Sequence, residues 1–396
     1  MTAKPNLEPA LSHQASQQNT IKKRIASIDI LRGLVMLLML VDHVRERFFY
    51  HHNVTDPITI DETSTSLFFT RITAHFCAPV FVFLTGLSAW LYAHPANKQP
   101  RSAQSFLLKR GLFIIFIEVS LVNFSWFGNY NALYLQVMWA IGLSMVTLAL
   151  LTKLPHWLIG LLGFTIVFGH NTLEFINFQP SETGYTLWTI LHDRGFIFTS
   201  DTFNVKASYP VLPWIGTILL GYFIAPTFSV STKTKQRIQT LLLSGFACIV
   251  LLILLRGFNI YGESMPWITG ENWIASFKSF INFTKYPPSL DFLLFTLGVA
   301  LIVLAILDNI NNKFTKVIEH FGTAPLFFYI LHLYVLLGSY RGLVGLFGNT
   351  KGDYWGVDHV WQVWCIALAL AILLYWPTKA FGHYKKQSSA AWIKYF

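Results

Sequence analysis

The sequence predicts an all-α integral membrane protein, a polytopic bundle of about ten transmembrane helices with both termini in the cytoplasm. Its 396 residues are 54% hydrophobic and only 12% charged, whereas soluble domains carry about 25% charged residues. Stretches long enough to cross a bilayer recur along the chain. Lys and Arg are concentrated in the loops that this topology places inside. These observations favour many spans over a soluble domain with one anchor.

The expected spans are ten apolar segments, each close to the roughly 20 residues that a helix needs to cross the hydrocarbon core. The fifth segment is the shortest of them. Their approximate limits are 28–48, 71–93, 108–127, 132–151, 155–170, 209–226, 238–256, 289–307, 323–343 and 359–377.

The polar, amide-rich residues 1–24 are expected to form a disordered cytoplasmic tail. Residues 25–380 form the expected membrane domain, and residues 381–396 a cytoplasmic C-terminal tail. Aromatic residues in the long outer loops predict either a cover over the outer mouth of the bundle or ordinary interfacial belts. These loops are 49–70, 171–208 and 257–288.

Composition and motifs also exclude several classes of function. The net charge of +10 is attributed to cytoplasmic loops rather than to a nucleic-acid surface. Cys77, Cys248 and Cys365 lie in apolar stretches, at spacings that suggest neither a metal site nor a disulfide framework. No P-loop, Rossmann fingerprint, G-x-S-x-G or HExxH motif occurs. We therefore predict no metal and no nucleic-acid partner.

The first span carries ionisable groups at membrane depth. Arg32 and Asp42 are separated by only nine uncharged residues, about 14 Å of helix and half the hydrocarbon thickness. Arg32 and His43 are eleven positions apart, so they return to within about 20° of each other around the helix axis. Asp29 lies near Arg32 on the same side. Because an arginine facing lipid is costly, this stripe predicts a polar cavity, with snorkelling and a self-contained Asp29–Arg32 pair as the alternative.

Further polar residues extend this pattern. Arg45 and Arg47 are expected to be snorkelling anchors at the interface. His75 lies at a depth similar to that of His43, on the next helix, and Pro79 cannot donate a hydrogen bond to the His75 carbonyl. Three more polar side chains lie within later spans, where they either face the cavity or connect helices by hydrogen bonds. They are Glu118, Asn123 and His332.

Several segments resemble a known family. "RIASIDILRGLVMLLMLVDHV" resembles the first helix of the heparan-α-glucosaminide N-acetyltransferase family, which is akin to wider transmembrane acyltransferases with a D-x-x-R-G start and a terminal His. The matching residues here are Asp29, Arg32, Gly33 and His43. "HFCAPVFVFLTGLSAWL" is similar to the second helix of that family. "YPVLPWIGTILLGYF", "KYPPSLDFLLFTLGVAL" and "FGTAPLFFYILHLYVL" resemble a bacterial branch, so the likeness covers roughly residues 24–380.

This resemblance implies acetyl transfer from cytoplasmic acetyl-CoA to an acceptor across the membrane, in a helical bundle with a through-going cavity. It also implies a catalytic histidine. In the wider acyltransferases the histidine matching His43 is essential. In the animal enzyme an Asn takes that position and the histidine follows about eleven residues later, near His51 or His52.

The sequence thus leads to one mechanistic hypothesis. His43 is the expected general base, oriented by Asp42 or His75, with His51 and His52 as alternates. Arg32 and basic residues at the cytoplasmic mouth are expected to hold the acetyl-CoA phosphates. Those basic residues are Arg101, Lys109 and Arg110.

The expected acceptor is a surface glycan, a glycolipid or a small amino sugar, and the expected location is a bacterial inner membrane. Whether the protein forms a homo-oligomer is left open. The rival hypothesis is a secondary transporter or proton-coupled exporter, because intramembrane Asp, Glu and His also build proton relays. Two similar halves, which many transporters have, are not seen in the sequence. A non-catalytic scaffold is a third alternative, but it leaves Arg32 unexplained.

Overall fold

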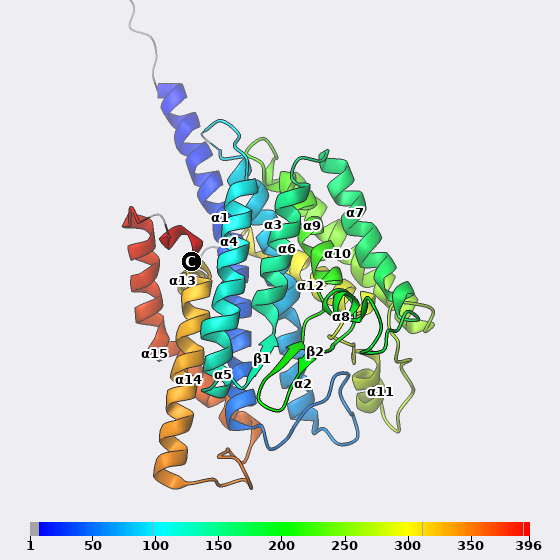
Figure 1. The fold of residues 1–396 in the computed structure, drawn as a ribbon. Helices are drawn as coiled ribbons and strands as arrows, with labels where there is room; N and C mark the ends of the chain where they lie inside the picture. The colour runs from blue at the N-terminus through cyan, green and yellow to red at the C-terminus, as the bar shows by residue number, and fades with distance from the viewer. Residues whose placement is uncertain (1–7, 97, 311, 391) are drawn as a thin grey trace, which may run out of the picture.

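The computed structural model describes residues 8–96, 98–310, 312–390 and 392–396. Helices make up 67% of the structure and strands are few, which confirms the mostly helical class. Most of the longer helices run roughly parallel to one axis (Figure 1). The helices are α1 Glu8–Phe48, α2 Thr65–Thr73, α3 Cys77–Ala93, α4 Gln104–Ile117, α5 Asn123–Phe127, α6 Val137–Leu151, α7 His156–Gly169, α8 Tyr185–Leu191, α9 Leu212–Ile224, α10 Thr234–Gly257, α11 Trp273–Phe280, α12 Leu290–Leu307, α13 Lys313–Thr323, α14 Pro325–Phe347 and α15 Val360–Gln387.

Each of the ten predicted spans falls largely on helix, and five helical stretches of the described chain are long and apolar enough to cross a membrane. Two shorter apolar helices, Val137–Leu151 and Leu212–Phe228, accompany them. This supports an integral membrane protein, whereas the number of ten crossings stays a prediction. The five stretches are Thr65–Ala93, Thr234–Gly257, Leu290–Leu307, Pro325–Phe347 and Val360–Gln387.

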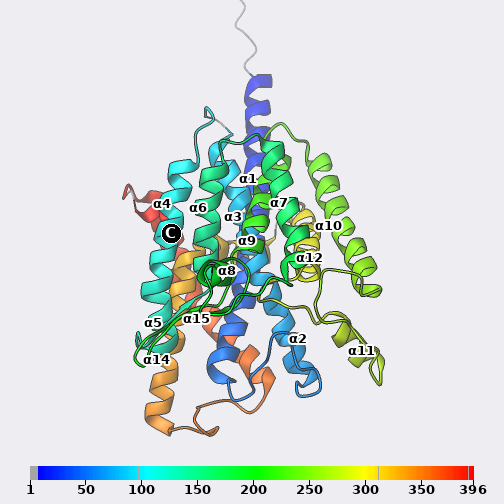
Figure 2. The same ribbon diagram turned by 45° about the vertical axis from the view of Figure 1, so that its right-hand side comes forward.

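Helix α1 runs through the whole length of the bundle, with α14 and α15 on one side and α7 and α10 on the other (Figures 1 and 2). It packs against α3, α13, α14 and α15. The predicted disordered tail differs in part, because α1 begins at Glu8 and residues 1–7 lie outside the described part. The division of the chain into a membrane domain and two tails stays a prediction.

Glycines allow pairs of helices to cross at backbone distance, as is common where small residues face each other in membranes. A side chain at Gly33 of α1 would overlap the Ile318 carbonyl of α13, and one at Gly322 would overlap the Asp29 carbonyl. The same reciprocal contact joins α3 and α9, where a side chain at Gly221 would overlap the Phe83 carbonyl. These crossings hold α1 and α3 in the centre of the bundle.

We expect Gly221→Val to prevent stable folding, because its side chain would force α9 away from the backbone of α3. The measurement is the yield of monodisperse protein in detergent and its thermal unfolding temperature. Gly338→Val is the matched control, because nothing lies within 4 Å of a Cβ built at Gly338 on α14. Equal yield and unfolding temperature for the two variants would contradict the role of this crossing.

A small sheet lies at one end of the bundle, together with α2, α8 and α11 (Figure 1). Its strands are β1 Ala132–Leu135, β2 Gly195–Thr199 and β3 Asn204–Ala207, in the order β1-β3-β2. Strand β3 pairs with β1 in parallel and with β2 in antiparallel orientation. The predicted span 132–151 is therefore wrong at its start, since its first residues form a strand and the helix begins at Val137.

Candidate functional site

Two adjoining cavities lie inside the bundle. The larger cavity, about 700 Å³, reaches toward the end that carries the sheet, and its wall includes Asp42, His43 and Tyr134. The smaller cavity, about 260 Å³, has Arg32 and Lys385 in its wall. Five residues line both cavities and form the junction between them. The junction residues are Met39, Phe81, Met138, Ile141 and Tyr329.

His43 lies in the wall of the larger cavity and is only 9% exposed. Its Nδ1 is 2.7 Å from Nε2 of His332, and Nδ1 of His332 lies 2.7 Å from the carbonyl oxygen of Phe328. Because a carbonyl only accepts, Nδ1 of His332 carries the proton, and its Nε2 accepts from Nδ1 of His43 when both rings are neutral. This series of hydrogen bonds leaves a lone pair on Nε2 of His43, as a general base requires.

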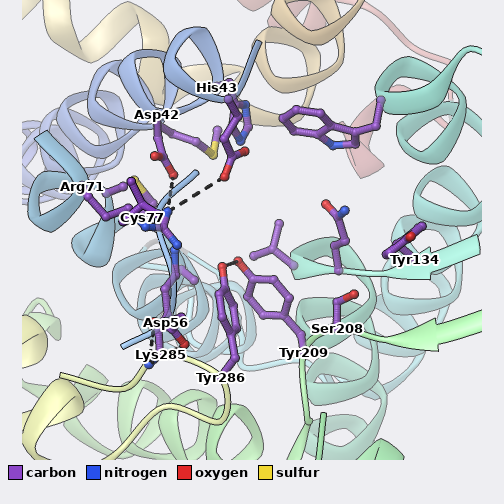
Figure 3. Close-up of a pocket in the computed structure, with 18 of the residues that line it drawn as sticks. Asp42, His43, Asp56, Arg71, Cys77, Tyr134, Ser208, Tyr209, Lys285 and Tyr286 are labelled. Atoms are coloured by element: carbon purple, nitrogen blue, oxygen red, sulfur yellow. Dashed lines mark hydrogen bonds and ion pairs between the residues drawn. The ribbon is translucent and has the colours of Figure 1, made fainter. Parts of the chain in front are cut away.

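Asp42 does not orient His43 as predicted. Its carboxylate oxygens are each 2.9 Å from an arginine, one from Arg45 and the other from Arg71. Glu46 joins the same network, 3.1 Å from Arg45 and 4.0 Å from Arg71. Figure 3 shows the contact between Asp42 and Arg71 beside His43. Arg45 is thus a buried partner of two carboxylates, 4% exposed, and the prediction that it snorkels is wrong.

The other predicted histidines lie elsewhere. His75 is fully buried in a 3-10 turn between α2 and α3, and its ring packs against Phe292 at 5.2 Å. It lines neither cavity and has no hydrogen-bond partner in the described part of the chain. His51 and His52 lie just beyond α1, outside both cavities, and each ring is tilted against that of Phe49 with the ring centres 4.9 Å apart. Burial lowers the pKa of His51.

The predicted outer loops supply much of the wall of the larger cavity. The hydroxyl of Tyr286, in the predicted loop 257–288, lies 2.9 Å from that of Tyr209, the first residue of the predicted span 209–226 (Figure 3). The Arg194 guanidinium lies 4.9 Å from the Tyr286 ring centre. Asp56 accepts a hydrogen bond from the Lys285 backbone N–H at 3.2 Å, and burial raises the pKa of Asp56 although Arg71 and Lys285 lower it.

The prediction of site residues missed this group, although the sequence carried a signal for it. Both tyrosines precede a proline, in "YPVLPW" and "KYPPSL". Aromatic rings are frequent elsewhere in the same wall. Those rings belong to Tyr50, Phe81, Trp126, Phe127, Tyr134, Tyr329, Tyr340 and Tyr354.

The smaller cavity has three cationic residues in its wall, namely Arg32, Arg110 and Lys385. Arg32 is held by Asp29 at 2.6 Å and by the Ser88 hydroxyl at 3.0 Å, so the predicted Asp29–Arg32 pair is present. No Asp or Glu of the described chain lines this cavity. Because Asp29 offsets the charge of Arg32, the excess positive charge of this wall comes from Arg110 and Lys385.

Two predicted residues of the cationic group are not in this wall. Arg101 precedes α4 and Lys109 is on α4; both are exposed and line neither cavity. Arg101 instead covers Tyr92, with its guanidinium 3.8 Å from the ring centre. Lys385, which the sequence assigned to a cytoplasmic tail, takes part because α15 continues to Gln387.

Glu118 and Asn123 have structural roles in the fold. Glu118 accepts hydrogen bonds from the backbone N–H groups of Met138 at 2.9 Å and Trp139 at 3.3 Å, which places a carboxylate at the N-terminus of α6. Asn123 binds the Tyr134 backbone N–H at 2.7 Å and its carbonyl at 3.0 Å. Neither residue lines a cavity. Among the described residues, no group of three or more His, Cys, Asp or Glu side chains is placed to hold a metal ion.

The family model for the catalytic domain of heparan-α-glucosaminide N-acetyltransferase matches residues 24–256, more than half of the chain. The chain belongs to this family. No curated protein matches it. Because the family is one of acetyltransferases, the protein is a membrane-bound acetyltransferase, with acetyl-CoA as the donor that the family implies.

The matched region of the acetyltransferase contains Arg32, Asp42, His43 and Arg110. Helices α14 and α15 lie beyond the match, although His332 on α14 contacts His43 and Lys385 on α15 lines the smaller cavity. The site therefore combines residues inside the matched region with residues that follow it in the chain.

Proposed function

We propose that the acetyltransferase carries an acetyl group from acetyl-CoA in the smaller cavity to an acceptor in the larger cavity, with His43 as the general base. The observation that carries this proposal is the junction of five shared residues, beside which His43 lies. A donor and an acceptor that enter from opposite ends would meet there.

The smaller cavity suits the donor. The phosphates of acetyl-CoA would bind Arg32, Arg110 and Lys385, since guanidinium and ammonium groups form strong charge-assisted hydrogen bonds with phosphate. Beyond these cations the wall is largely apolar, and methionines adapt their shape to a flexible ligand. They would surround the pantetheine arm and the acetyl group. The methionines are Met36, Met39, Met138 and Met145.

His43 suits the transfer step. Its Nε2 would take the proton from an acceptor amine or hydroxyl as the acceptor oxygen or nitrogen attacks the thioester carbonyl carbon. When the tetrahedral intermediate collapses, the carbon–sulfur bond breaks and the CoA sulfur takes the proton back from His43. His332 would hold the imidazole in the required tautomer through its contact at 2.7 Å.

The larger cavity suits a sugar acceptor. The flat faces of its aromatic rings pack against apolar faces of a sugar, while tyrosine hydroxyls and charged groups bind its polar edge. Arg194 and Lys285 line this cavity and form no ion pair with any described residue. A surface glycan, a glycolipid or a small amino sugar is the proposed acceptor, and whether the protein acts as a homo-oligomer stays open.

The proposed topology has ten crossings, with both termini in the cytoplasm of a bacterial inner membrane. It is supported by the positions of the cations. Arg110 belongs to α4, and Lys385 belongs to the last turn of α15. The start of α4 and the end of α15 lie toward the end of the bundle opposite the sheet (Figure 1). This end would face the cytoplasm, where acetyl-CoA is made.

The test uses purified protein in sealed vesicles, with radiolabelled acetyl-CoA on one side and glucosamine on the other. We expect labelled N-acetylglucosamine to form only when acetyl-CoA has access to the smaller cavity. Arg110→Gln is expected to weaken acetyl-CoA binding about tenfold or more, because a charged hydrogen bond is worth roughly 1.5–3 kcal/mol.

Lys109→Gln is the matched control, because Lys109 neighbours Arg110 in α4 but is exposed. Equal losses of affinity in the two variants would contradict the donor site. An absence of acetyl-CoA binding by the wild-type protein would refute the function. Glucosamine flux without acetyl-CoA would favour the rival transporter, which the adjoining cavities also accommodate.

A further inference from the structure

The junction between the cavities contains a single side chain that can donate a hydrogen bond. Four of the five junction residues are apolar, namely Met39, Phe81, Met138 and Ile141. The fifth is Tyr329, on α14. Any group that passes from one cavity to the other therefore meets one phenol hydroxyl in an otherwise apolar constriction.

Tyr329 is also a direct neighbour of the two histidines. Its ring centre is 5.8 Å from that of His43 and 5.6 Å from that of His332. Tyr329 and His332 are three residues apart on α14, so they share one face of the helix. The Tyr329 side chain is held firmly, since the residue is only 1% exposed.

The hydroxyl of Tyr329 forms no hydrogen bond with any described residue, whereas four tyrosine hydroxyls of this region are bonded. Tyr209 and Tyr286 bind each other at 2.9 Å. The Tyr340 hydroxyl accepts from the Trp355 backbone N–H at 3.3 Å. Tyr334, on the same helix as Tyr329, donates to the Leu121 carbonyl at 3.1 Å. The Tyr329 hydroxyl is thus free to donate a hydrogen bond to a molecule bound in the cavities.

Acetyl transfer needs a hydrogen-bond donor at the junction of the two cavities. When the acceptor attacks the thioester, the carbonyl oxygen becomes negatively charged, and fixed hydrogen-bond donors in a water-poor site stabilise that charge. A phenol keeps its proton at neutral pH, because its unperturbed pKa is about 10. His43 cannot fill this role as well, since its Nε2 has to accept the proton of the acceptor.

We propose that Tyr329 is a catalytic residue that donates its hydroxyl to the acetyl carbonyl oxygen and stabilises the oxyanion of the tetrahedral intermediate. This inference rests on the proposed acetyl transfer at His43. The new bond joins the acceptor to the carbonyl carbon, the carbonyl π electrons move to oxygen, and Tyr329 keeps its proton while hydrogen-bonded to that oxygen. Collapse re-forms the carbonyl and expels the CoA sulfur, which takes the proton from His43.

The test compares wild type, Tyr329→Phe and Tyr334→Phe as full-length proteins in detergent. Tyr329→Phe is expected to lower kcat for transfer from acetyl-CoA to glucosamine about 10²–10³-fold, the usual cost of one oxyanion donor. The Kd for acetyl-CoA is expected to rise by no more than about tenfold, because one neutral hydrogen bond to the bound thioester is lost. Tyr334→Phe is expected to keep the wild-type kcat, because its hydroxyl binds a backbone carbonyl away from the junction. Retained binding of acetyl-CoA also shows that Tyr329→Phe is folded.

A second readout needs no turnover. The infrared carbonyl band of bound acetyl-CoA, labelled with ¹³C at the carbonyl carbon, is expected to move to higher frequency in Tyr329→Phe, because the hydrogen bond to the carbonyl oxygen is lost. A wild-type kcat together with an unmoved band in Tyr329→Phe would overturn the role of Tyr329 and leave the proposed function intact. Failure of wild-type protein to transfer acetyl groups at all would overturn both.

Discussion

Replacing His43 with alanine is expected to lower the rate of acetyl transfer about 10²–10⁴-fold, the range typical for loss of a positioned general base. Binding of acetyl-CoA should be unchanged, because the cationic wall of the smaller cavity does not include His43. The measurement is kcat for transfer from acetyl-CoA to glucosamine, together with the Kd for acetyl-CoA. His43→Ala should therefore lower kcat without changing the Kd for acetyl-CoA.

The controls are His51→Ala and His52→Ala, the positions that the spacing in the animal enzyme keeps as alternates. Both residues lie outside the two cavities, so these variants are expected to keep wild-type kcat. Loss of activity in His51→Ala or His52→Ala, with retention in His43→Ala, would transfer the role of base to the loop histidines.

Replacing Asp42 with alanine is expected to destabilise the protein by about 3–5 kcal/mol, the usual cost of removing one partner from a buried ion pair. Arg45 and Arg71, 4% and 5% exposed, would share a single carboxylate, that of Glu46. The measurement is the free energy of unfolding in mixed detergent and denaturant.

Two further variants decide whether uncompensated charge is the cause. Asp358→Ala removes an ion pair with Lys351 at an exposed site, and no measurable change is expected there. The double variant Asp42→Leu/Arg71→Met removes one charge of each sign, so much of the lost stability should return. A double variant as unstable as Asp42→Ala would show that the shape of Asp42 matters rather than its charge.

The candidate site was predictable where its residues lie on one helix. Arg32 and His43 are both in α1, and the helix repeat places them on one stripe; the structure has them in two adjoining cavities. Asp42 was predicted to act on His43, but one residue along a helix turns a side chain by about 100°. Its carboxylate consequently points to Arg45 and Arg71 instead.

Residues from distant parts of the chain were harder to place. His332 was recognised as a polar residue within a span, yet nothing in the sequence indicated that it would contact His43, 289 positions earlier. The sequence did not indicate which of the basic residues near the start of α4 would line a cavity. They differ in which side of the helix they lie on, because Arg110 is in the wall of the smaller cavity whereas Lys109 is exposed.

The sequence by itself determined that this protein is helical and built from membrane-length apolar segments, and it placed Arg32 and His43 on one polar stripe. Composition and helical periodicity are local properties, so they can be read without knowing the fold. Tertiary structure alone decided that His332 orients His43, that Lys385 joins Arg32, and that Tyr329 lies at the junction. Those contacts depend on which helices pack together, and that choice is made by shape and by small-residue crossings such as Gly33 with Gly322.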